Sequence, residues 1–235
     1  MKPPLPPKNN PREKSPNWIS VSAGDLTWQI NCDFNKPELL RHLAAPEQLM
    51  MGAAEPLRRD SRPRNTLVVR LKLPDCHHFP LIIKRYRPVS FWNSLKEHTR
   101  SSRAISAFEK AFFLLRENIS TASPIAASQT RRGLGRSESY LITEEVPNAR
   151  PLREFRSGNF SANENKIVIR RFAEVIARLH NASLSHTDPT LSNFFVQNDT
   201  FPFWMADHVT CPSFPYIQFR NFINRIDFKI DFFKS

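Results

Sequence analysis

The run HTDPTLSN at residues 186–193 has residue types and a spacing suited to phosphoryl transfer. Asp188 follows His186 by two residues, and Asn193 follows Asp188 by five. At this spacing, an aspartate at the turn of a short loop can accept the proton of an attacking hydroxyl group. The asparagine, farther round the same loop, can hold a metal ion on the phosphates of a nucleotide. A polar turn rich in Asp and Asn, without a catalytic task, is the alternative interpretation.

A second acid, Asp207, follows this loop after two short expected strands, FFV at 194–196 and WM at 204–205. A phosphotransferase of this kind needs a metal-binding aspartate at that place. We therefore predict that Asn193 and Asp207 bind Mg²⁺, which prefers oxygen ligands from such side chains together with phosphate and water. His186 is expected to hold the loop by packing and hydrogen bonding.

Two charged residues lie upstream in the order that a nucleotide site requires. Lys84 ends the apolar run LIIK, where its ammonium group could point at nucleotide phosphates. Glu109 lies in a predicted helix, next to the apolar face formed by Phe108 and Phe112. From there its carboxylate could hold Lys84 through an ion pair. The ordinary alternatives are a strand-end lysine and a solvated glutamate beside Lys110.

The composition permits a folded protein with an anionic partner. The chain has 235 residues, 40% of them hydrophobic and 19 of them Phe, which is enough for one large domain or two lobes. The net charge of +12 favours a nucleotide, a nucleic acid, an acidic lipid headgroup or an acidic glycan, unless it is only a solvated basic surface. Nucleic acid is disfavoured because the sequence has no RRM, KH or zinc-finger signature.

The sequence also indicates the compartment. Cys32, Cys76 and Cys211 are far apart and form no CxxC pair, which suits a reducing cytosol. Residues 1–16 are rich in Pro and Lys and are expected to be a disordered tail without a secretory signal. No run of 18 apolar residues exists, so no segment is expected to span a membrane.

The expected elements run from strands to a long helix and then to the polar loop. Strand patterns cover 18–29, 65–73, 79–86 and 139–145. Helical spacing covers 36–51, broken at Pro46, and 101–118, and a capping box at Ser161 and Glu164 opens a long helix. This order predicts an α+β fold with a β-rich N-lobe (17–146) and a small, mostly helical C-lobe (147–235). A cleft is expected between the lobes.

Four segments resemble the lipopolysaccharide core kinases, the Kdo/heptose kinase family with a protein-kinase-like fold. The segments are LIIKRYRP (81–88), RAISAFEKAFFLLRENI (103–119), SYLITEEV (139–146) and FAEVIARLHNASLSHTDPTLSNFFV (172–196). The resemblance covers roughly Leu67 to Asp207. Its most specific parts are the KRY ending of the first segment and the block LH…HxD…NF. These parts recur loosely in RIO-type and in aminoglycoside or choline kinases.

The resemblance implies phosphorylation of a sugar hydroxyl on lipopolysaccharide, with ATP and Mg²⁺, at the cytoplasmic face of the inner membrane. It implies that Lys84 contacts the ATP phosphates and that Glu109 pairs with it. Asp188 would be the catalytic acid/base, and Asn193 and Asp207 would bind the metal.

The resemblance also implies which residues hold the adenine base and which contact the acceptor substrate. The segment Glu144–Val146 would be the hinge, which offers backbone groups to adenine. A basic group near the cleft mouth would meet the anionic substrate on an anionic membrane surface. Its members are Arg85, Arg87, Lys96, Arg100 and Arg103.

Three departures from the family pattern favour a second hypothesis, a catalytically impaired kinase-like binding module. The hairpin expected over the phosphates, Asp60–Asn65, has no glycine, so backbone amides cannot approach phosphate as closely there. Arg62 and Arg64 are cations that could substitute. His208 and Val209 follow Asp207, so there is no DFG triplet. Only 28 residues follow Asp207, so a small second lobe is expected.

Overall fold

The computed structural model describes most of the chain between residues 17 and 210. The described stretches are 17–52, 55–56, 66–73, 80–87, 101–130, 138–153, 162–182, 184–186, 193–197, 203–205 and 209–210. The predicted tail at 1–16 lies outside them, as do Asp188, Asp207 and the glycine-free hairpin at 60–65. No helix in these stretches is long and apolar enough to cross a membrane.

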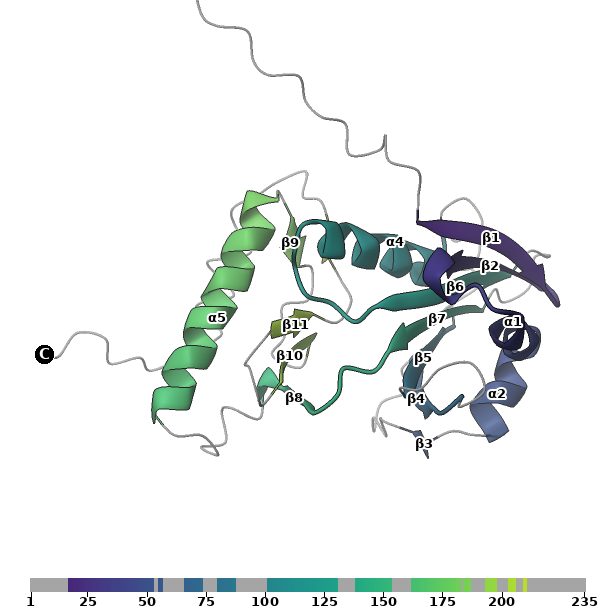
Figure 1. Ribbon diagram of the computed structural model, residues 1–235, viewed down its shortest axis with the longest axis horizontal. Helices are drawn as coiled ribbons and strands as arrows, with labels where there is room; N and C mark the ends of the chain where they lie inside the picture. The colour runs from purple at the N-terminus through teal and green to yellow at the C-terminus, as the bar shows by residue number, and fades with distance from the viewer. Residues whose placement is uncertain are drawn as a thin grey trace, which may run out of the picture.

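A seven-stranded antiparallel sheet forms the larger part of the described fold (Figure 1). The strand order is β1-β2-β6-β7-β5-β4-β3, so the hairpin β1-β2 extends one edge of the sheet and β3 lies at the other. The bounds are β1 Trp18–Ala23, β2 Leu26–Asn31, β3 Glu55–Pro56, β4 Thr66–Leu71, β5 Leu81–Tyr86, β6 Pro124–Thr130 and β7 Ser139–Glu144. This large sheet carries most of the strands that the sequence predicts.

Side chains alternate along the strands, and both faces of the large sheet are covered. One face packs on two short helices, α1 (Pro37–Leu43) and α2 (Pro46–Gly52), through a core that includes Trp28 and Ile83. The other face packs on α4 (Arg103–Arg116). The buried core on that side consists of Tyr86, Ala104, Ile105, Phe108, Ala127 and Leu141. Because both faces are buried, β7 has an almost continuous run of buried residues.

Helix α4 begins at a serine cap that also fixes it to the sheet. The side-chain oxygen of Ser102 accepts a hydrogen bond from the N–H of Ile105, at 3.2 Å, which satisfies an amide that has no partner within the helix. The same hydroxyl donates to the carbonyl oxygen of Ser128 on β6, at 3.3 Å. On one face of the helix, the rings of Phe108 and Phe112 contact the ring of Trp18 of β1. The cap and the aromatic contacts together set the position of α4 over the sheet.

A second core joins the end of α4 to the long helix α5 (Ala162–Asn181). Leu114 and Ile119, from the end of α4 and the turn after it, are buried together with Val168, Ile176 and other apolar residues of α5. The rings of Phe172 and Phe194 meet edge to face with centroids 5.0 Å apart. The apolar spacing along α5 therefore buries one side of the helix, as the sequence predicts.

Short strands complete the part of the fold beside α5. A three-stranded sheet has the order β11-β10-β8, and β12 pairs with β9. The bounds are β8 Ala149–Pro151, β9 Ser185–His186, β10 Phe194–Gln197, β11 Phe203–Met205 and β12 Val209–Thr210. Figure 1 shows β8, β10 and β11 between α5 and the large sheet. The described residues from 147 onward thus form one long helix and five short strands.

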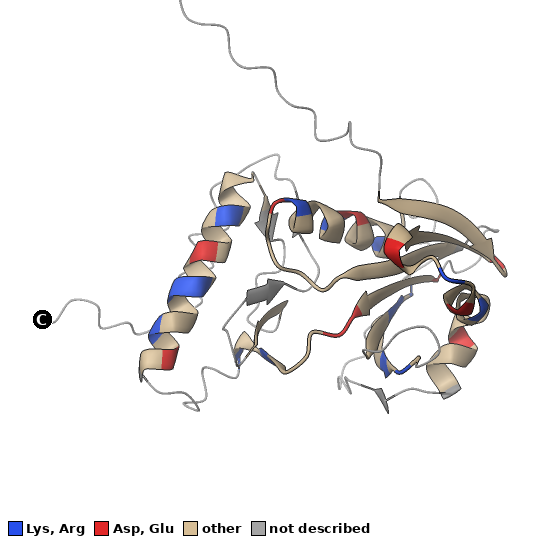
Figure 2. Ribbon diagram, viewed as in Figure 1, with Lys and Arg blue, Asp and Glu red and all other residues tan. Residues whose placement is uncertain are grey.

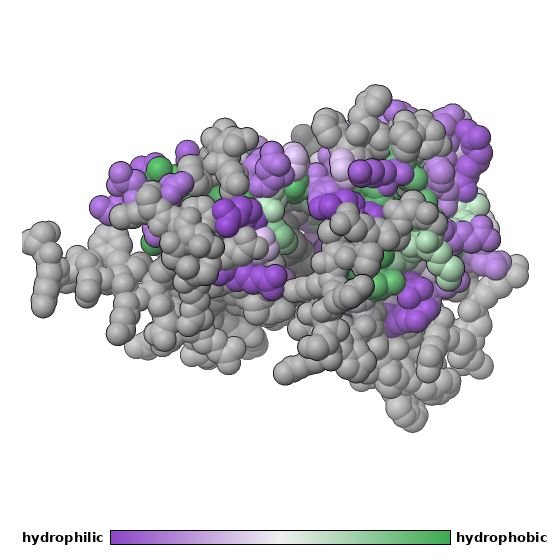
Figure 3. Space-filling model, turned by 90° about the horizontal axis from the view of Figure 1, so that it is seen from below, coloured by the Kyte–Doolittle hydropathy of each residue, from purple (hydrophilic) through white to green (hydrophobic). Residues whose placement is uncertain are grey.

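The described surface carries few large apolar side chains. Met51 and Leu115 are the large hydrophobic residues that stand exposed among the described residues. In Figure 3 the apolar residues of the described part appear only in small areas between hydrophilic ones. The basic residues are spread over the helices and strands rather than gathered on one element (Figure 2).

Candidate functional site

Lys84 lies on the face of the large sheet that α4 covers. Its Cα partner on β7 is Leu141, and Tyr86 follows two residues later on the same strand. Both of these residues belong to the core beneath α4. Because directly opposed residues and residues two apart share a face, the side chain of Lys84 leaves the strand toward α4. The neighbouring residues Leu81 and Ile83 face the opposite core, which anchors the strand.

A row of paired residues connects Lys84 on β5 to β2, across β7 and β6. The successive Cα partners are Lys84, Leu141, Ala127 and Gln29. Gln29 lies on β2, three strand spacings from Lys84, which is roughly 14 Å. The position of Glu109 on α4 can be compared with the two ends of this row, Lys84 and Gln29.

Glu109 is held at the Gln29 end of the row. Much of the glutamate is exposed, but partial burial of its carboxyl group raises the pKa of Glu109. A hydrogen bond from the Gln29 side chain and the charge of Lys110 offset part of this rise. The structure therefore does not bring Glu109 and Lys84 together. The reason is helical geometry: Glu109 lies on the β2 side of α4, and α4 has no other carboxylate to turn toward β5.

The predicted hinge follows directly from β7. Glu144 ends the strand, and its N–H donates to the carbonyl oxygen of Ser123 at 3.0 Å. The N–H of Glu145 donates in the other direction, to the carbonyl oxygen of Pro80 at 2.9 Å. Because backbone groups alternate between the two edges of a strand, the polar groups of Glu144 lie on the edge away from β5. An ion pair between Arg70 of β4 and Glu145 is added here, which the sequence did not predict.

The strands around the polar loop bring its two flanks together. His186 of β9 is the Cα partner of Val209 of β12. Asp188 follows His186 by two residues and Asp207 precedes Val209 by two, but both acids lie outside the described residues. Asn193 is half-buried and directly precedes β10.

The hairpin β10-β11 also relates Asn193 to the chain that leads to Asp207. Phe194 is the Cα partner of Met205, and Val196 is the partner of Phe203, so the Phe194–Met205 end is the open end of the hairpin. Asn193 stands at that open end, and the chain leaves it toward Asp207. The register thus places Asn193 next to Met205, the last described residue before Asp207.

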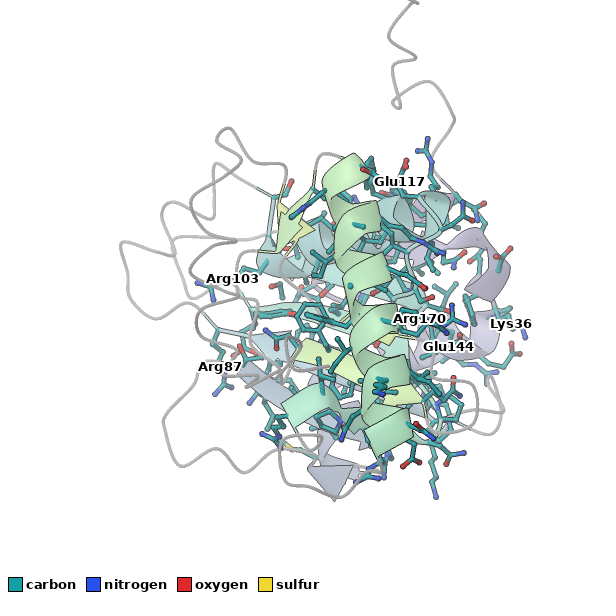
Figure 4. The ribbon with its side chains drawn as sticks, turned by 90° about the vertical axis from the view of Figure 1, so that its left-hand side faces the viewer. Lys36, Arg87, Arg103, Glu117, Glu144 and Arg170 are labelled. Atoms are coloured by element: carbon teal, nitrogen blue, oxygen red, sulfur yellow. The ribbon has the colours of Figure 1, made fainter. Side chains whose placement is uncertain are left out.

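The predicted basic group is only partly described, and its described members leave different faces. Arg85 and Arg87 alternate with Lys84 and so leave β5 on the face opposite to α4, whereas Arg103 begins α4. Arg87 forms an ion pair with Glu138, at 2.5 Å. In Figure 4, Arg87 and Arg103 nevertheless lie on the same flank of the molecule, and Glu144 lies on the other. Lys96 and Arg100 lie outside the described residues.

The described residues alone do not make a metal centre. They include no group of three or more His, Cys, Asp and Glu side chains that could hold a metal ion. The predicted set instead pairs the amide oxygen of Asn193 with a carboxylate of Asp207. Such hard oxygen donors fit Mg²⁺, which keeps several of its other positions for water and phosphate.

Comparison with known proteins relates these residues to one family. The model of the Lipopolysaccharide kinase (Kdo/WaaP) family matches residues 90–211. A 3-deoxy-D-manno-octulosonic acid kinase of Vibrio parahaemolyticus is 26% identical over 122 residues, which are 51% of this chain and 48% of that protein. The enzyme of the same name from Actinobacillus succinogenes is 26% identical over 113 residues, 47% of this chain and 46% of its own. The chain spans about half the length of these curated relatives.

The fold is also similar to that of a solved structure, WaaP in complex with acyl carrier protein. The similarity has a TM-score of 0.50 and 16% sequence identity, and it covers 81% of this chain and 73% of the other. At this identity the similarity concerns the fold alone. It agrees with a mixed architecture in which a large sheet covered by helices is followed by a long helix and short strands.

Proposed function

The chain belongs to the lipopolysaccharide kinase (Kdo/WaaP) family and has its kinase-like α+β fold, and from this we propose that it is a sugar kinase of lipopolysaccharide biosynthesis. In the proposed reaction, a hydroxyl oxygen of an inner-core sugar attacks the γ-phosphorus of ATP. The bond from that phosphorus to the bridging oxygen breaks, and ADP leaves. The observation that carries the proposal is the family match, which spans the loop with Asp188, Asn193 and Asp207.

The nucleotide would bind between the large sheet and the polar loop. Lys84 leaves β5 on the α4 side of the sheet, where its compact cation would contact the phosphates. The carbonyl group of Glu144 would accept a hydrogen bond from the adenine edge, and the N–H of Val146 would donate one to it. We propose the lobe boundaries 17–146 and 147–235 on the same ground, since the hinge lies between them.

The polar loop would supply the residues around the transferred phosphate. Asp188 would orient the acceptor hydroxyl and accept its proton as the oxygen bonds to phosphorus. Asn193 and Asp207 would hold Mg²⁺, and the open end of β10-β11 supports their common location. When bound, the metal would neutralise charge on the phosphate oxygens. Pairing of Glu109 with Lys84 stays a prediction. In this structure the carboxylate of Glu109 is instead hydrogen-bonded by the side chain of Gln29.

The acceptor would be Kdo or heptose of the inner core, and Kdo is the first to test because both curated relatives are named for it. The substrate is an anionic glycolipid, so the basic chain would work in the cytoplasm at the inner face of the inner membrane. Arg87 and Arg103, on the flank opposite to the hinge, are candidates for contact with the acceptor. Nucleic acid is not a proposed partner.

A nucleotide-binding and transfer experiment tests the proposal. We expect ATP to raise the melting temperature of the wild-type protein only with Mg²⁺, and we expect the Asp207→Ala variant to lose this shift. The Asp188→Ala variant should keep the shift but lose at least about 10³-fold in phosphate transfer to a Kdo-terminated lipid A acceptor. Transfer to heptose alone would change the acceptor but keep the reaction class.

A catalytically impaired kinase-like module is the second candidate, and the hydrogen bond between Gln29 and Glu109 favours it. Without an ion pair from α4, Lys84 would have one restraint fewer at the phosphates. This candidate predicts a nucleotide-dependent shift without transfer to Kdo or heptose acceptors. Turnover by the wild-type protein that Asp188→Ala removes would contradict it.

A further inference from the structure

An ion pair crosses the sheet at the end where the chain leaves it for the hinge. Nη2 of Arg70 on β4 lies 2.5 Å from Oε1 of Glu145, which directly follows β7. Strand β5 runs between these two strands, so the pair spans two strand spacings, about 10 Å. The two side chains keep only 31% and 21% of their exposure. Partial withdrawal from water makes such a pair more costly to break than a fully exposed one.

The ion pair lies on the same face of the sheet as Lys84. Arg70 is the Cα partner of Ile82, and Ile82 is the partner of Thr143, so the three residues form a row across three strands. Glu145 follows Thr143 by two residues, and its N–H bond to Pro80 continues the ladder to that point. Since side chains two apart share a face, the pair passes over Ile82 on the α4 side. Lys84 is the next residue of β5 on that side.

The backbone around Glu145 is restrained together with its side chain. Its N–H is turned toward β5 by the bond to Pro80, at 2.9 Å. The N–H of Glu144 points to the opposite edge, where it donates to the carbonyl oxygen of Ser123. Three residues after Glu145 the chain turns at Asn148, which has a φ of 54°. Glu145 is therefore the last point at which the strand is fixed before the chain leaves the sheet.

We infer that Arg70 is a positioning residue for the nucleotide base. Through Glu145 it holds the segment Glu144–Val146 so that the carbonyl group of Glu144 and the N–H of Val146 keep one direction, and this sets the preference for adenine. The inference rests on the proposed function, because it assigns this edge of the hinge to the base. It goes beyond that function by naming a residue on a different strand, β4, that determines base selection.

The experiment compares variants that remove the ion pair with one that removes an unrelated pair. Arg70→Met deletes one partner, and Glu145→Gln removes the charge of the other. Arg171→Met is the matched control, since it deletes an Arg–Glu pair with Glu174 on α5 in which both side chains are more exposed, at 48% and 41%. The double change Arg70→Glu with Glu145→Arg reverses the pair and is the rescue variant.

Two readouts separate positioning from general stability. The first is the ratio of the Kd values for Mg·ITP and Mg·ATP in the full chain, since ITP carries a carbonyl group where ATP carries the amino group that would donate to Glu144. The second is hydrogen exchange at the amides of residues 144–146 without nucleotide. We expect Arg70→Met and Glu145→Gln to lower the ITP/ATP ratio by about tenfold, mainly through weaker ATP binding. Exchange at 144–146 should be faster, and the rescue variant should recover both readouts in part.

Each other result overturns the inference in a distinguishable way. Wild-type ratios in both variants, with ATP still bound by the wild type, would show that the base is selected without Arg70 while the proposed function stands. Equal weakening of ATP and ITP, without recovery in the reversed pair, would assign Arg70 to sheet stability alone. Unchanged exchange at residues 144–146 would show that the ion pair does not restrain the hinge. Failure of the wild type to bind either nucleotide would remove the proposed function and base selection together.

Discussion

At the scale of single residues, the stability of Glu109 variants at different pH tests whether the partly buried carboxylate destabilises the fold when it is charged. Burial raises its pKa above the ordinary value of 4.5, and a group with a raised folded pKa is most favourable to folding in its protonated form. Its contribution to stability is therefore complete below about pH 4.5 and is lost as the pH rises through the folded pKa. The hydrogen bond from Gln29 recovers only part of the cost.

We predict that Glu109→Gln raises the melting temperature at pH 7 and changes it little at pH 4. The amide oxygen of glutamine can still accept the hydrogen bond from Gln29, but it carries no charge to desolvate. Thermal unfolding at a series of pH values measures the effect, and the difference from wild type should grow between pH 4 and 7. A variant less stable than wild type at pH 7 would mean that the charge of Glu109 stabilises the fold.

The same variant bears on the predicted pairing with Lys84. If catalysis needs that ion pair, Glu109→Gln should lose activity while it gains stability, so that the two readouts move in opposite directions. Unchanged turnover would leave Glu109 as a surface residue held by Gln29. Either result is informative because the substitution keeps the size and shape of the side chain.

Sequence reasoning at the residue scale succeeds where a local pattern decides and fails where strand register decides. The apolar run LIIK predicts a strand that ends near Lys84, and the structure has Lys84 on β5. Gln29 as the partner of Glu109 depends on the pairing of β2 with β6 and on the rotation of α4. Arg70 meets Glu145 across 75 positions of the sequence, and only the order β7-β5-β4 makes that contact.

At the scale of elements, the start of α4 is a specific point at which the sheet and helix are joined. Ser102 both caps the helix and donates to Ser128 of β6. We predict that Ser102→Ala lowers the free energy of unfolding by about 1 to 2 kcal/mol, because it removes the cap and leaves one carbonyl bond unmade. Denaturant unfolding measures the loss.

Ser101→Ala is the matched control for the cap. Ser101 is exposed and lies one residue outside the cap position, so its loss should change the free energy of unfolding by less than about 0.5 kcal/mol. Equal effects of the two substitutions would indicate that the helix begins one residue earlier than the structure has it.

Most elements of the large sheet follow from their sequence patterns. The pair β1-β2, the helices α1 and α2 with the break at Pro46, and the strands β4, β5 and β7 are all confirmed. Helix α4, which Ser102 caps, lies within the helical segment expected at 101–118. β6 was not predicted, because PIAASQT contains small residues with little strand preference of their own. It becomes a strand because β2 and β7 pair with it on both sides.

The short strands near the polar loop show the opposite limit. β9 and β12 have two residues each, and β11 has three. No periodic pattern can be recognised over the two residues of β9 or β12, so only tertiary pairing defines these two strands. The strands expected at FFV and WM are confirmed as β10 and β11. The polar loop itself lies outside the described residues, so its location stays a prediction from the spacing of His, Asp and Asn, which is a chemical requirement rather than a structural preference.

At the scale of the whole molecule, α4 belongs to two cores. Its first turns are buried against the large sheet through Ala104, Ile105 and Phe108, whereas Leu114 near its end belongs to the core with α5. The helix therefore connects the part of the chain that carries Lys84 to the part that carries the polar loop. A proposed active site built from both parts requires that this connection keep its geometry.

We predict that Leu114→Ala destabilises the α5 core and is felt beyond the substituted helix. Leu114 is only 4% exposed, so the loss of its side chain should cost about 2 to 5 kcal/mol. Hydrogen exchange should be faster at amides of α5. It should change less in β1 and β2, which contribute to the core with α1 and α2. The measurement is native-state exchange of the full chain at neutral pH.

Leu115→Ala separates this effect from a loss of helix packing in general. Leu115 is the neighbouring residue with the same side chain, but it is 38% exposed, so its truncation should cost less than about 1 kcal/mol. If Leu114→Ala also weakens Mg·ATP binding while Leu115→Ala does not, the alignment of the two parts contributes to the nucleotide site. Faster exchange in α5 with normal nucleotide affinity would instead mean that the α5 core can loosen without moving the hinge or Lys84. Equal exchange in both variants would contradict the assignment of Leu114 to the second core, because only burial distinguishes these two residues.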